Sequence, residues 1–196
     1  VHKKFIKNEF NNTKILEIGG FVGKNLEYLY KKNKGILKMD MVEISDECIN
    51  NVKKNYSYIN AYNLDFTKDI SGNITEKYDI IFCFGVLHHM INKLDQVFKN
   101  IDILLKPNGK LIFWEPNGYF LTKLREKWYK KDKFFDETEE GPLKYDELYN
   151  KYFKDKFKKS SVVYFGGPAF FLVLSNIIFR IPHKLKKFYS LPLIYF

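Results

Sequence analysis

The segment Ile15-Leu-Glu-Ile-Gly-Gly-Phe-Val-Gly23 is a strand pattern that runs directly into a glycine-rich turn. A helical pattern follows over 23–32, and a second apolar run ends at the acid Glu43. A strand, a tight turn, a helix and a strand-end acid in this order are typical of nucleoside-binding α/β units. In such units the helix amino end presents free N–H groups and the acid accepts ribose hydroxyls. Phe21 replaces the usual middle glycine of the turn.

Strand and helix patterns alternate along the rest of the chain. The pattern predicts strands at 14–19, 35–44, 56–64, 78–85 and 110–114, and helices at 23–32, 45–55 and 94–105. This alternation predicts an α/β fold, a Rossmann-like, doubly wound and mostly parallel sheet with helices on both faces. Helices at 119–133 and 143–153 and a sixth strand at 160–165 are expected next. We expect a single domain over 1–196, with a cofactor-binding core at 14–117 and a substrate-shaping part at 118–196.

The positive charge of the chain is concentrated at its carboxyl end. The 196 residues carry a net charge of +10, and residues 151–196 hold nine Lys and Arg against one acid. This distribution indicates a local contact with an anionic partner rather than a nucleic-acid groove across the domain. The uncharged run 162–179 could form a buried or substrate-covering helix, a helix on a membrane surface, or a membrane span. Its Gly-Gly-Pro interruption disfavours the span.

The cysteine content and the amino-terminal sequence together predict the cellular compartment of the protein. Two cysteines, Cys48 and Cys83, are too few for a disulfide framework, and we expect both to be buried in a reducing compartment. The amino end, Val1-His-Lys-Lys-Phe-Ile-Lys7, has no apolar core of a signal peptide. We therefore expect a cytoplasmic protein, with peripheral membrane contact through the basic carboxyl-terminal segment as an option. The oligomeric state is left open.

Glu17 narrows the cofactor that the turn could hold. It lies two residues before Gly19, where dinucleotide folds usually have a glycine because a pyrophosphate lies against the turn. A carboxylate repels phosphate but holds an ammonium group, directly or through a water molecule. S-adenosylmethionine carries an ammonium and a sulfonium and no phosphate. Glu17 therefore favours this cofactor over NAD.

Polar residues also follow the third and fourth predicted strands. Asp65 could accept the exocyclic amine of adenine while the N–H of Phe66 meets a ring nitrogen. His88 and His89 follow strand four at the carboxyl edge, where α/β sheets bind ligands, and either could act as a general base. The alternative is structural: Asp65 as a turn or cap residue, the histidines as turn fillers, and Glu115 as a satisfied strand-end acid.

Together these segments resemble the class I S-adenosylmethionine-dependent methyltransferases, in particular the branch that acts on small molecules. The matching segments are 15–23, 42–45, 64–66, 78–89 and 105–117, in order and with fitting spacing. The resemblance implies that Glu17, Gly19 and Gly23 border the methionine part of S-adenosylmethionine, Glu43 the ribose and Asp65 the adenine. The full implied cofactor set is Glu17, Gly19, Gly20, Phe21, Gly23, Glu43, Ile44, Asp65, Phe66, Phe84 and Gly85, with no metal.

The resemblance further implies methyl transfer to a small-molecule acceptor. The Glu115-Pro-Asn117 segment is similar to that of members acting on lipid-like, quinone or sugar substrates. Nucleic-acid amino methyltransferases need an Asn/Asp-Pro-Pro-aromatic loop where this chain has Gly85-Val-Leu-His-His89, so a nucleic-acid partner is not expected. An RNA methyltransferase stays an alternative because of the basic tail. A non-catalytic scaffold is another, because Phe21 and short, incomplete ends depart from the family pattern.

Overall fold

The computed structural model describes residues 10–119, 122–123, 140–158 and 161–164. The chain separates into two compact units, Val1–Gly118 with Asp136–Lys144 and Tyr119–Phe135 with Tyr145–Phe196. The first unit contains the sheet. The second contains the short helix α6 (Tyr145–Leu148), which continues into a π-helical turn, Tyr149–Phe153.

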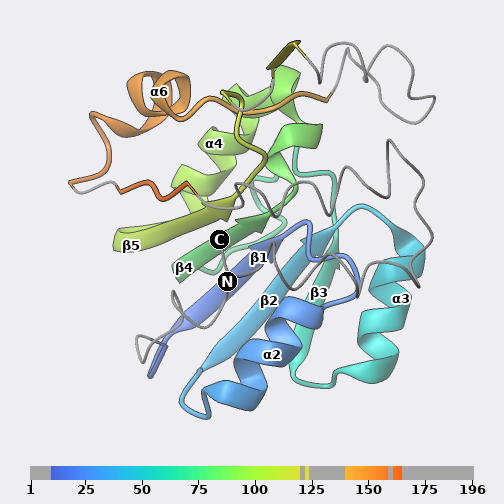
Figure 1. Cartoon of the computed structure of the whole chain (residues 1–196). Helices are drawn as coiled ribbons and strands as arrows, with labels where there is room; N and C mark the ends of the chain where they lie inside the picture. Colours follow the sequence, from blue (N-terminus) through green and yellow to red (C-terminus); the bar gives the residue numbers. More distant parts are fainter. Residues whose placement is uncertain (1–9, 120–121, 124–139, 159–160, 165–196) are drawn as a thin grey trace, which may run out of the picture. The chain divides into compact units, whose positions relative to one another are not determined.

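The first unit is built on a five-stranded parallel sheet in the order β3-β2-β1-β4-β5 (Figure 1). The strands are β1 (Lys14–Ile18), β2 (Lys38–Glu43), β3 (Ile59–Asn63), β4 (Tyr78–Phe84) and β5 (Leu105–Trp114). The strand order reverses between β1 and β4, and the carboxyl end of such a switch point is where open α/β sheets bind ligands. The predicted Rossmann-like parallel sheet is therefore confirmed.

Helices cover both faces of this sheet. The helices α2 (Lys24–Lys32) and α3 (Asp46–Asn55) lie on one face and α4 (Leu94–Leu104) lies on the other (Figure 1). Ser45 caps α3, because its hydroxyl accepts the N–H of Cys48 at 3.3 Å. Two 3₁₀ turns, η1 (Leu87–His89) and η2 (Ile91–Lys93), connect β4 to α4.

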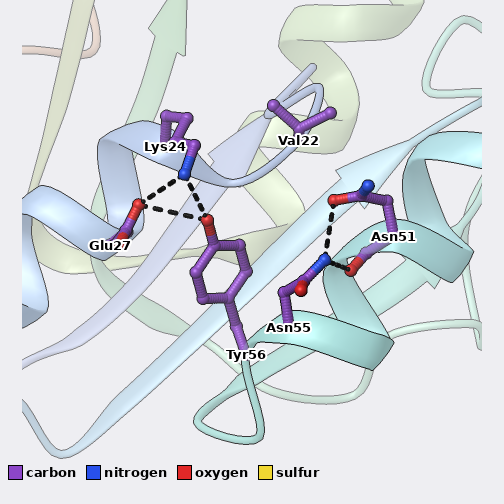
Figure 2. A pocket seen from close by; sticks show the side chains of 6 residues that line it. All are labelled: Val22, Lys24, Glu27, Asn51, Asn55 and Tyr56. Carbon is purple, nitrogen blue, oxygen red and sulfur yellow. Dashed lines mark hydrogen bonds and ion pairs between the residues drawn. The ribbon is translucent and has the colours of Figure 1, made fainter.

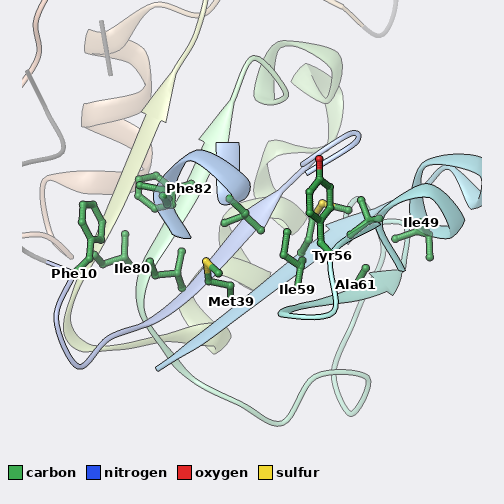
Figure 3. Packing of buried hydrophobic residues seen from close by; sticks show 13 residues of the cluster. Phe10, Met39, Ile49, Tyr56, Ile59, Ala61, Ile80 and Phe82 are labelled. Carbon is green, nitrogen blue, oxygen red and sulfur yellow. The ribbon is translucent and has the colours of Figure 1, made fainter. Parts of the chain in front are cut away.

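The strands bury side chains on both faces. Alternate strand residues pack against α2 and α3 in one core cluster (Figure 3), which includes Ile15, Met39, Met41, Ile80, Phe82, Leu26, Leu29, Ile49 and Val52. Successive strand side chains point to opposite faces, so Leu16, Ile81 and Cys83 belong to the other face, and they are fully buried as well. Burial on both faces explains why β4 is apolar almost throughout. Both cysteines are buried, as predicted.

Strand β5 begins earlier than predicted. The sequence predicted a strand from Lys110, with Lys106-Pro-Asn-Gly109 as a stop for the preceding helix, yet pairing to β4 already starts at Leu105. A register shift opposite Tyr78 and Ile80 accommodates this segment, in which Asn108 has a left-handed φ of 62°. The turn-forming residues 106–109 therefore form an irregularity inside β5 rather than a separate loop before it.

The predicted carboxyl-terminal elements are only partly described. The sixth strand predicted at 160–165 is wrong for its described residues 161–164, which are irregular and exposed. β-Branched side chains favour a strand only where packing and a neighbouring strand support it. The helix predicted at 143–153 begins later, at Tyr145. Most of the predicted helix at 119–133, residues 165–179 of the apolar run and the basic carboxyl-terminal segment beyond it lie outside the described residues. Within the described ranges, no helix has the length and apolarity to cross a bilayer.

A buried acid, Asp40, lies in the middle of β2. Its Oδ2 accepts the hydroxyl of Tyr78 at 2.5 Å and that of Tyr62 at 3.4 Å, and Lys38 Nζ lies 3.3 Å away. Within the described part of the chain, Oδ1 has no hydrogen-bond partner. Burial and the Asp40 bond raise the pKa of Tyr78 far above its usual range, so the phenol remains a donor. The hydroxyl of Tyr78 therefore forms the shortest hydrogen bond that replaces the hydration of this buried carboxylate.

Tyr78→Phe is expected to lower the free energy of unfolding by about 2 kcal/mol, because it removes a hydrogen bond to a buried charge. Tyr62→Phe is the matched control, since its hydroxyl lies 3.4 Å from the same carboxylate and the bond is weak. We expect the control to cost less than about 1 kcal/mol. Urea denaturation of the three proteins measures the difference, and equal losses would contradict this account of Asp40.

Candidate active site

The turn after β1 depends on glycine for both conformation and space. Gly19 has a φ of 67°, and its N–H donates to the carbonyl of Val42 at 2.9 Å. A Cβ at Gly19 would lie 2.3 Å from Cγ2 of Val86, a residue of the turn after β4. A Cβ at Gly20 would lie 2.4 Å from the sulfur of Met41. The turn is therefore seated directly against β2 and the β4 turn.

Phe21 does not fill the interior of the turn. Its side chain is 65% exposed, and its backbone has a φ of 49°. This left-handed conformation costs roughly 1–2 kcal/mol in a residue with a side chain. The Phe21 N–H donates to Glu43 Oε2 at 3.0 Å, so the acid at the end of β2 holds the turn in place.

Glu43 binds backbone amides on both of its oxygens. Oε1 accepts the N–H groups of Ile44 at 2.9 Å and Ser45 at 3.1 Å, while Oε2 accepts that of Phe21. A carboxylate has about four acceptor sites, so one remains for a ribose hydroxyl. Ile44 beside it is 65% exposed and forms an apolar surface at this edge. The ribose role of Glu43 stays a prediction.

Glu17 is a buried carboxyl group at the carboxyl end of β1. The side chain is 1% exposed, and Oε1 accepts from Asn25 Nδ2 at 2.7 Å. No described residue donates to Oε2. Burial, with a further contribution from Glu43, raises the pKa of Glu17 to about 7, although the Asn25 hydrogen bond opposes the rise. An ammonium group would satisfy this orphaned oxygen, so the residues fit the cofactor that the sequence suggested.

Asp65 is engaged in its own turn. Oδ1 accepts the N–H of Thr67 at 3.0 Å and its hydroxyl at 2.7 Å, and Oδ2 lies 3.2 Å from Lys68 Nζ. These contacts lower the pKa of Asp65, the Thr67 hydroxyl first among them. Asp65 therefore has the contacts of a turn residue, which is the structural alternative to an adenine-binding role. Phe66 is buried, and its carbonyl accepts from Asn100, so the adenine roles of both residues stay predictions.

The two histidines have different surroundings. His88 Nδ1 lies 2.7 Å from Glu115 Oε2, and this glutamate side chain is only 4% exposed. His89 is 48% exposed, and its Nδ1 lies 2.8 Å from Glu140 Oε1. The two rings are close, with centroids 3.9 Å apart. A later segment also joins the turn, because Gly141 N–H donates to the His88 carbonyl at 3.0 Å.

The carboxyl ends of β1, β2 and β4 therefore meet in one place. Phe21 donates to Glu43, Gly19 donates to the carbonyl of Val42, and Gly19 also approaches the β4 turn, which carries His88. Gly85 continues that turn with a φ of 66°, and its N–H bonds to the carbonyl of Trp114 at the end of β5. Phe84 and Gly85 are partly exposed there, and their cofactor-binding role stays a prediction.

Three residues at this edge were not predicted to act there. Asn25 pairs with Glu17, Val86 packs against Gly19, and Glu115 binds the His88 turn. The Glu115-Pro-Asn segment was a visible signal, but it suggested a substrate class rather than a partner for histidine. No sequence signal points to Asn25 or Val86, because their contacts join separate elements.

A pocket of about 500 Å³ opens between α2 and α3 and contains none of the predicted site residues (Figure 2). It is lined by Val22, Lys24, Glu27, Asn51, Asn55 and Tyr56. Its polar groups bond to one another: Lys24 Nζ donates to Tyr56 at 2.8 Å and to Glu27 at 2.9 Å, and Asn55 donates to Asn51. Because these polar groups already bond to one another, we take the carboxyl edge of the sheet, and not this pocket, as the candidate site.

Comparisons with known proteins indicate a methyltransferase domain. Residues 16–111 match the family model of a methyltransferase domain. The chain is 30% identical over 132 residues to the tRNA N(3)-methylcytidine methyltransferase trm140 of Schizosaccharomyces pombe, covering 62% of this chain and 42% of that protein. The fold is similar to that of an S-adenosylmethionine-dependent methyltransferase from Clostridium acetobutylicum, with a TM-score of 0.50 and 22% identity over 59% of this chain and 46% of that one. It is also similar to the PH0226 protein of Pyrococcus horikoshii OT3, with a TM-score of 0.53 and 22% identity over 71% and 64% of the two chains.

The strand order, the glycine turn and the acid at the end of β2 define a Rossmann-like α/β domain of the kind that holds an adenosine cofactor. Residues 16–111 match a methyltransferase domain, and the fold is that of the class I S-adenosylmethionine-dependent methyltransferases, whose cofactor is S-adenosylmethionine. The chain spans less than half the length of the fission-yeast and clostridial relatives.

Proposed function

We propose that this chain binds S-adenosylmethionine at the carboxyl ends of β1, β2 and β4 and catalyses methyl transfer to a small-molecule acceptor. One observation carries the cofactor part: Glu17 Oε2 is buried beneath the glycine turn without a donor among the described residues. A phosphate would be repelled there, whereas an ammonium group would complete the site. The match of residues 16–111 to a methyltransferase domain supports the same reaction.

The chain's own residues would mainly position the reactants. Glu17 would hold the ammonium group, Glu43 a ribose hydroxyl, and Ile44 would lie against the adenine. S-adenosylmethionine, when bound, supplies an electrophilic methyl group, so the protein contributes alignment and the charge environment. Gly19 and Gly85, both left-handed, allow the backbone of two turns to come close to the ligand.

Transfer to tRNA is a second candidate. The fission-yeast relative is a tRNA methyltransferase, which weakens the expectation that nucleic acid is not a partner. The basic residues 151–196 also favour an anionic partner, either an RNA or a membrane surface that presents the acceptor. The relative's acceptor atom cannot be carried over, because the chain covers only 42% of that protein.

Methyl-labelled S-adenosylmethionine tests both candidates in parallel reactions. One set of reactions contains hydroxylated lipids, quinols and sugars, and the other contains total tRNA. We expect label in a small molecule; label in tRNA, with a rate that falls steeply as salt rises, would favour the second candidate. Label in neither, although S-adenosylhomocysteine binds, would favour a non-catalytic scaffold of the same fold.

Glu43→Ala is expected to weaken S-adenosylhomocysteine binding about 100-fold, because it removes a charged hydrogen bond to the ribose and releases the Phe21 amide. Glu47→Ala is the control, since Glu47 is an exposed acid in the first turn of α3. Calorimetry should give the control wild-type affinity. Similar affinities for wild type and Glu43→Ala would remove the ribose role.

A further inference from the structure

We propose that Asn100, on α4, is a positioning residue that fixes the loop after β3 for adenine recognition and so makes the chain selective for adenosine over inosine ligands. This inference rests on the proposed function and deepens it, because it concerns the base of the same cofactor. It starts from a buried polar side chain that no sequence motif marks. Asn100 is 0% exposed, and the other buried residues of α4 are all apolar: Leu94, Val97, Phe98, Ile101 and Leu104.

The connection from β3 to β4 has no regular structure of its own. Residues 64–77 carry the chain past β2 and β1 to β4, and they form turns but no helix. The crossover between parallel strands is usually a helix, whose backbone groups bond to one another. This connection lacks such internal bonding, although its side chains Phe66, Ile70 and Ile74 are buried. Its backbone groups therefore need partners on other elements.

Asn100 supplies two of these partners. Its Nδ2 donates to the carbonyl of Phe66 at 2.9 Å and to the carbonyl of Lys68 at 2.7 Å. Its Oδ1 accepts from Gln96 Nε2 at 2.9 Å, so both amide protons and the amide oxygen have partners and the side chain has one orientation. A buried amide that is bonded at every group is rigid. The helix α4 therefore holds the loop at two carbonyls, one on each side of Thr67.

The hydrogen bonds of this loop determine where the Phe66 N–H points. The carbonyl of Asp65 accepts the N–H of Lys68 at 3.1 Å, inside the turn. The N–H of a trans peptide points opposite to its carbonyl, so the Phe66 N–H, which shares this peptide, points out of the turn. The next peptide is fixed at both ends, because its carbonyl accepts from Asn100 and its N–H, that of Thr67, donates to Asp65 Oδ1 at 3.0 Å. The loop therefore presents an outward N–H next to the Asp65 side chain.

An N–H donor next to a carboxylate is complementary to one edge of adenine. Adenine N1 accepts a hydrogen bond and the neighbouring 6-amino group donates one, whereas hypoxanthine carries a proton on N1 and a carbonyl at position 6. An inosine ligand would therefore face the Phe66 N–H with a donor and the Asp65 carboxylate with an acceptor. A site built for hydrogen bonds strongly rejects a ligand that leaves its buried groups unpaired. The loop is also tied to the ribose side, because the Leu64 N–H donates to the Glu43 carbonyl at 3.1 Å.

The test compares Asn100→Leu with Gln96→Leu, a matched control on the same helix that keeps both bonds from Asn100 to the loop. Calorimetry with the full chain measures three ligands: S-adenosylhomocysteine, its inosine analogue S-inosylhomocysteine, and 5′-methylthioadenosine, which lacks the amino acid part. We expect the wild type and the control to prefer S-adenosylhomocysteine over S-inosylhomocysteine by at least about 100-fold. In Asn100→Leu this preference should fall below about tenfold, because the loop no longer has a fixed shape.

A second affinity ratio separates positioning from a general loss of structure. The preference for S-adenosylhomocysteine over 5′-methylthioadenosine reports on the ammonium site at Glu17, and it should agree within about twofold among the three proteins. A variant that is merely less stable loses affinity for all three ligands in the same proportion, so both ratios keep their wild-type values. A wild-type preference for adenosine over inosine in Asn100→Leu would overturn the role of Asn100.

The wild-type chain distinguishes this inference from the proposed function. Absent S-adenosylhomocysteine binding would overturn the proposed function, whereas binding without preference over S-inosylhomocysteine would overturn the inference alone. If Asn100→Leu fails to fold, hydrogen exchange of the Asn100 side-chain amide in the wild type provides the test. Saturating S-adenosylhomocysteine should slow this exchange about tenfold and saturating S-inosylhomocysteine should not. Equal exchange with the two ligands would contradict a coupling between Asn100 and the base.

Discussion

Gly19→Ala is expected to lower the free energy of unfolding by about 3 kcal/mol and to weaken S-adenosylhomocysteine binding at least 100-fold. Two costs add at this position. The backbone φ of 67° is unfavourable for alanine, and the new Cβ would lie 2.3 Å from Val86 Cγ2, which belongs to a stiff, branched side chain. To relieve this contact the turn must move away from β4, which would displace the turn from the proposed cofactor site above Glu17.

Gly72→Ala is the control that separates the conformational cost of a left-handed alanine from the steric cost of the new Cβ. Gly72 has a similar left-handed φ of 87°, but a Cβ there meets nothing within 4 Å. It should therefore lose only the conformational part, roughly 1–2 kcal/mol, and leave ligand binding intact. The double variant Gly19→Ala, Val86→Ala should recover part of the lost stability and affinity. Equal effects of Gly19→Ala and Gly72→Ala in thermal denaturation and calorimetry would show that contact with Val86 is unimportant.

S-adenosylhomocysteine affinity is expected to rise about tenfold per pH unit from pH 5 to pH 7 and then to level off. Burial raises the pKa of Glu17 to about 7, so the carboxyl group is mostly protonated in the free chain below that pH. Only the ionised form attracts an ammonium group, and binding therefore releases one proton in this range. Glu17→Gln should bind weakly, at least 100-fold below the wild type at pH 8, with no dependence on pH.

Folding stability should change in the opposite direction over the same range. The pKa of Glu17 is about 7 in the folded chain and 4.5 as the ordinary value. Below pH 4.5 both states are protonated; above it the unfolded state ionises first, so stability falls by about 3 kcal/mol until pH 7 and then stays level. Glu17→Gln removes this fall. Urea denaturation at pH 5, 6, 7 and 8 checks it, and a wild-type curve parallel to that of Glu17→Gln would be inconsistent with a buried, perturbed carboxyl group.

Much of the secondary structure of the first unit could be predicted, because it follows from patterns among neighbouring residues in the sequence. The alternation of strand and helix patterns predicted the parallel sheet, and the predicted strand at 78–85 and helix at 45–55 lie close to the observed β4 and α3. The predictions failed where a pattern depends on a distant partner. The residues 161–164 have strand-forming side chains but no regular structure, and 106–109 form an irregularity inside β5, between the paired residues Leu105 and Lys110, despite their turn signal.

The amino-acid sequence by itself determined the α/β class, the glycine turn, and the set of acids and histidines that reach the carboxyl edge. These features follow from periodicity and from residue types next to one another along the chain. Only the tertiary structure decided which groups are paired: Glu17 with Asn25, Phe21 with Glu43, and His88 with Glu115. Such contacts join residues up to 27 positions apart, and packing of separate strands, not local pattern, sets their distance and burial.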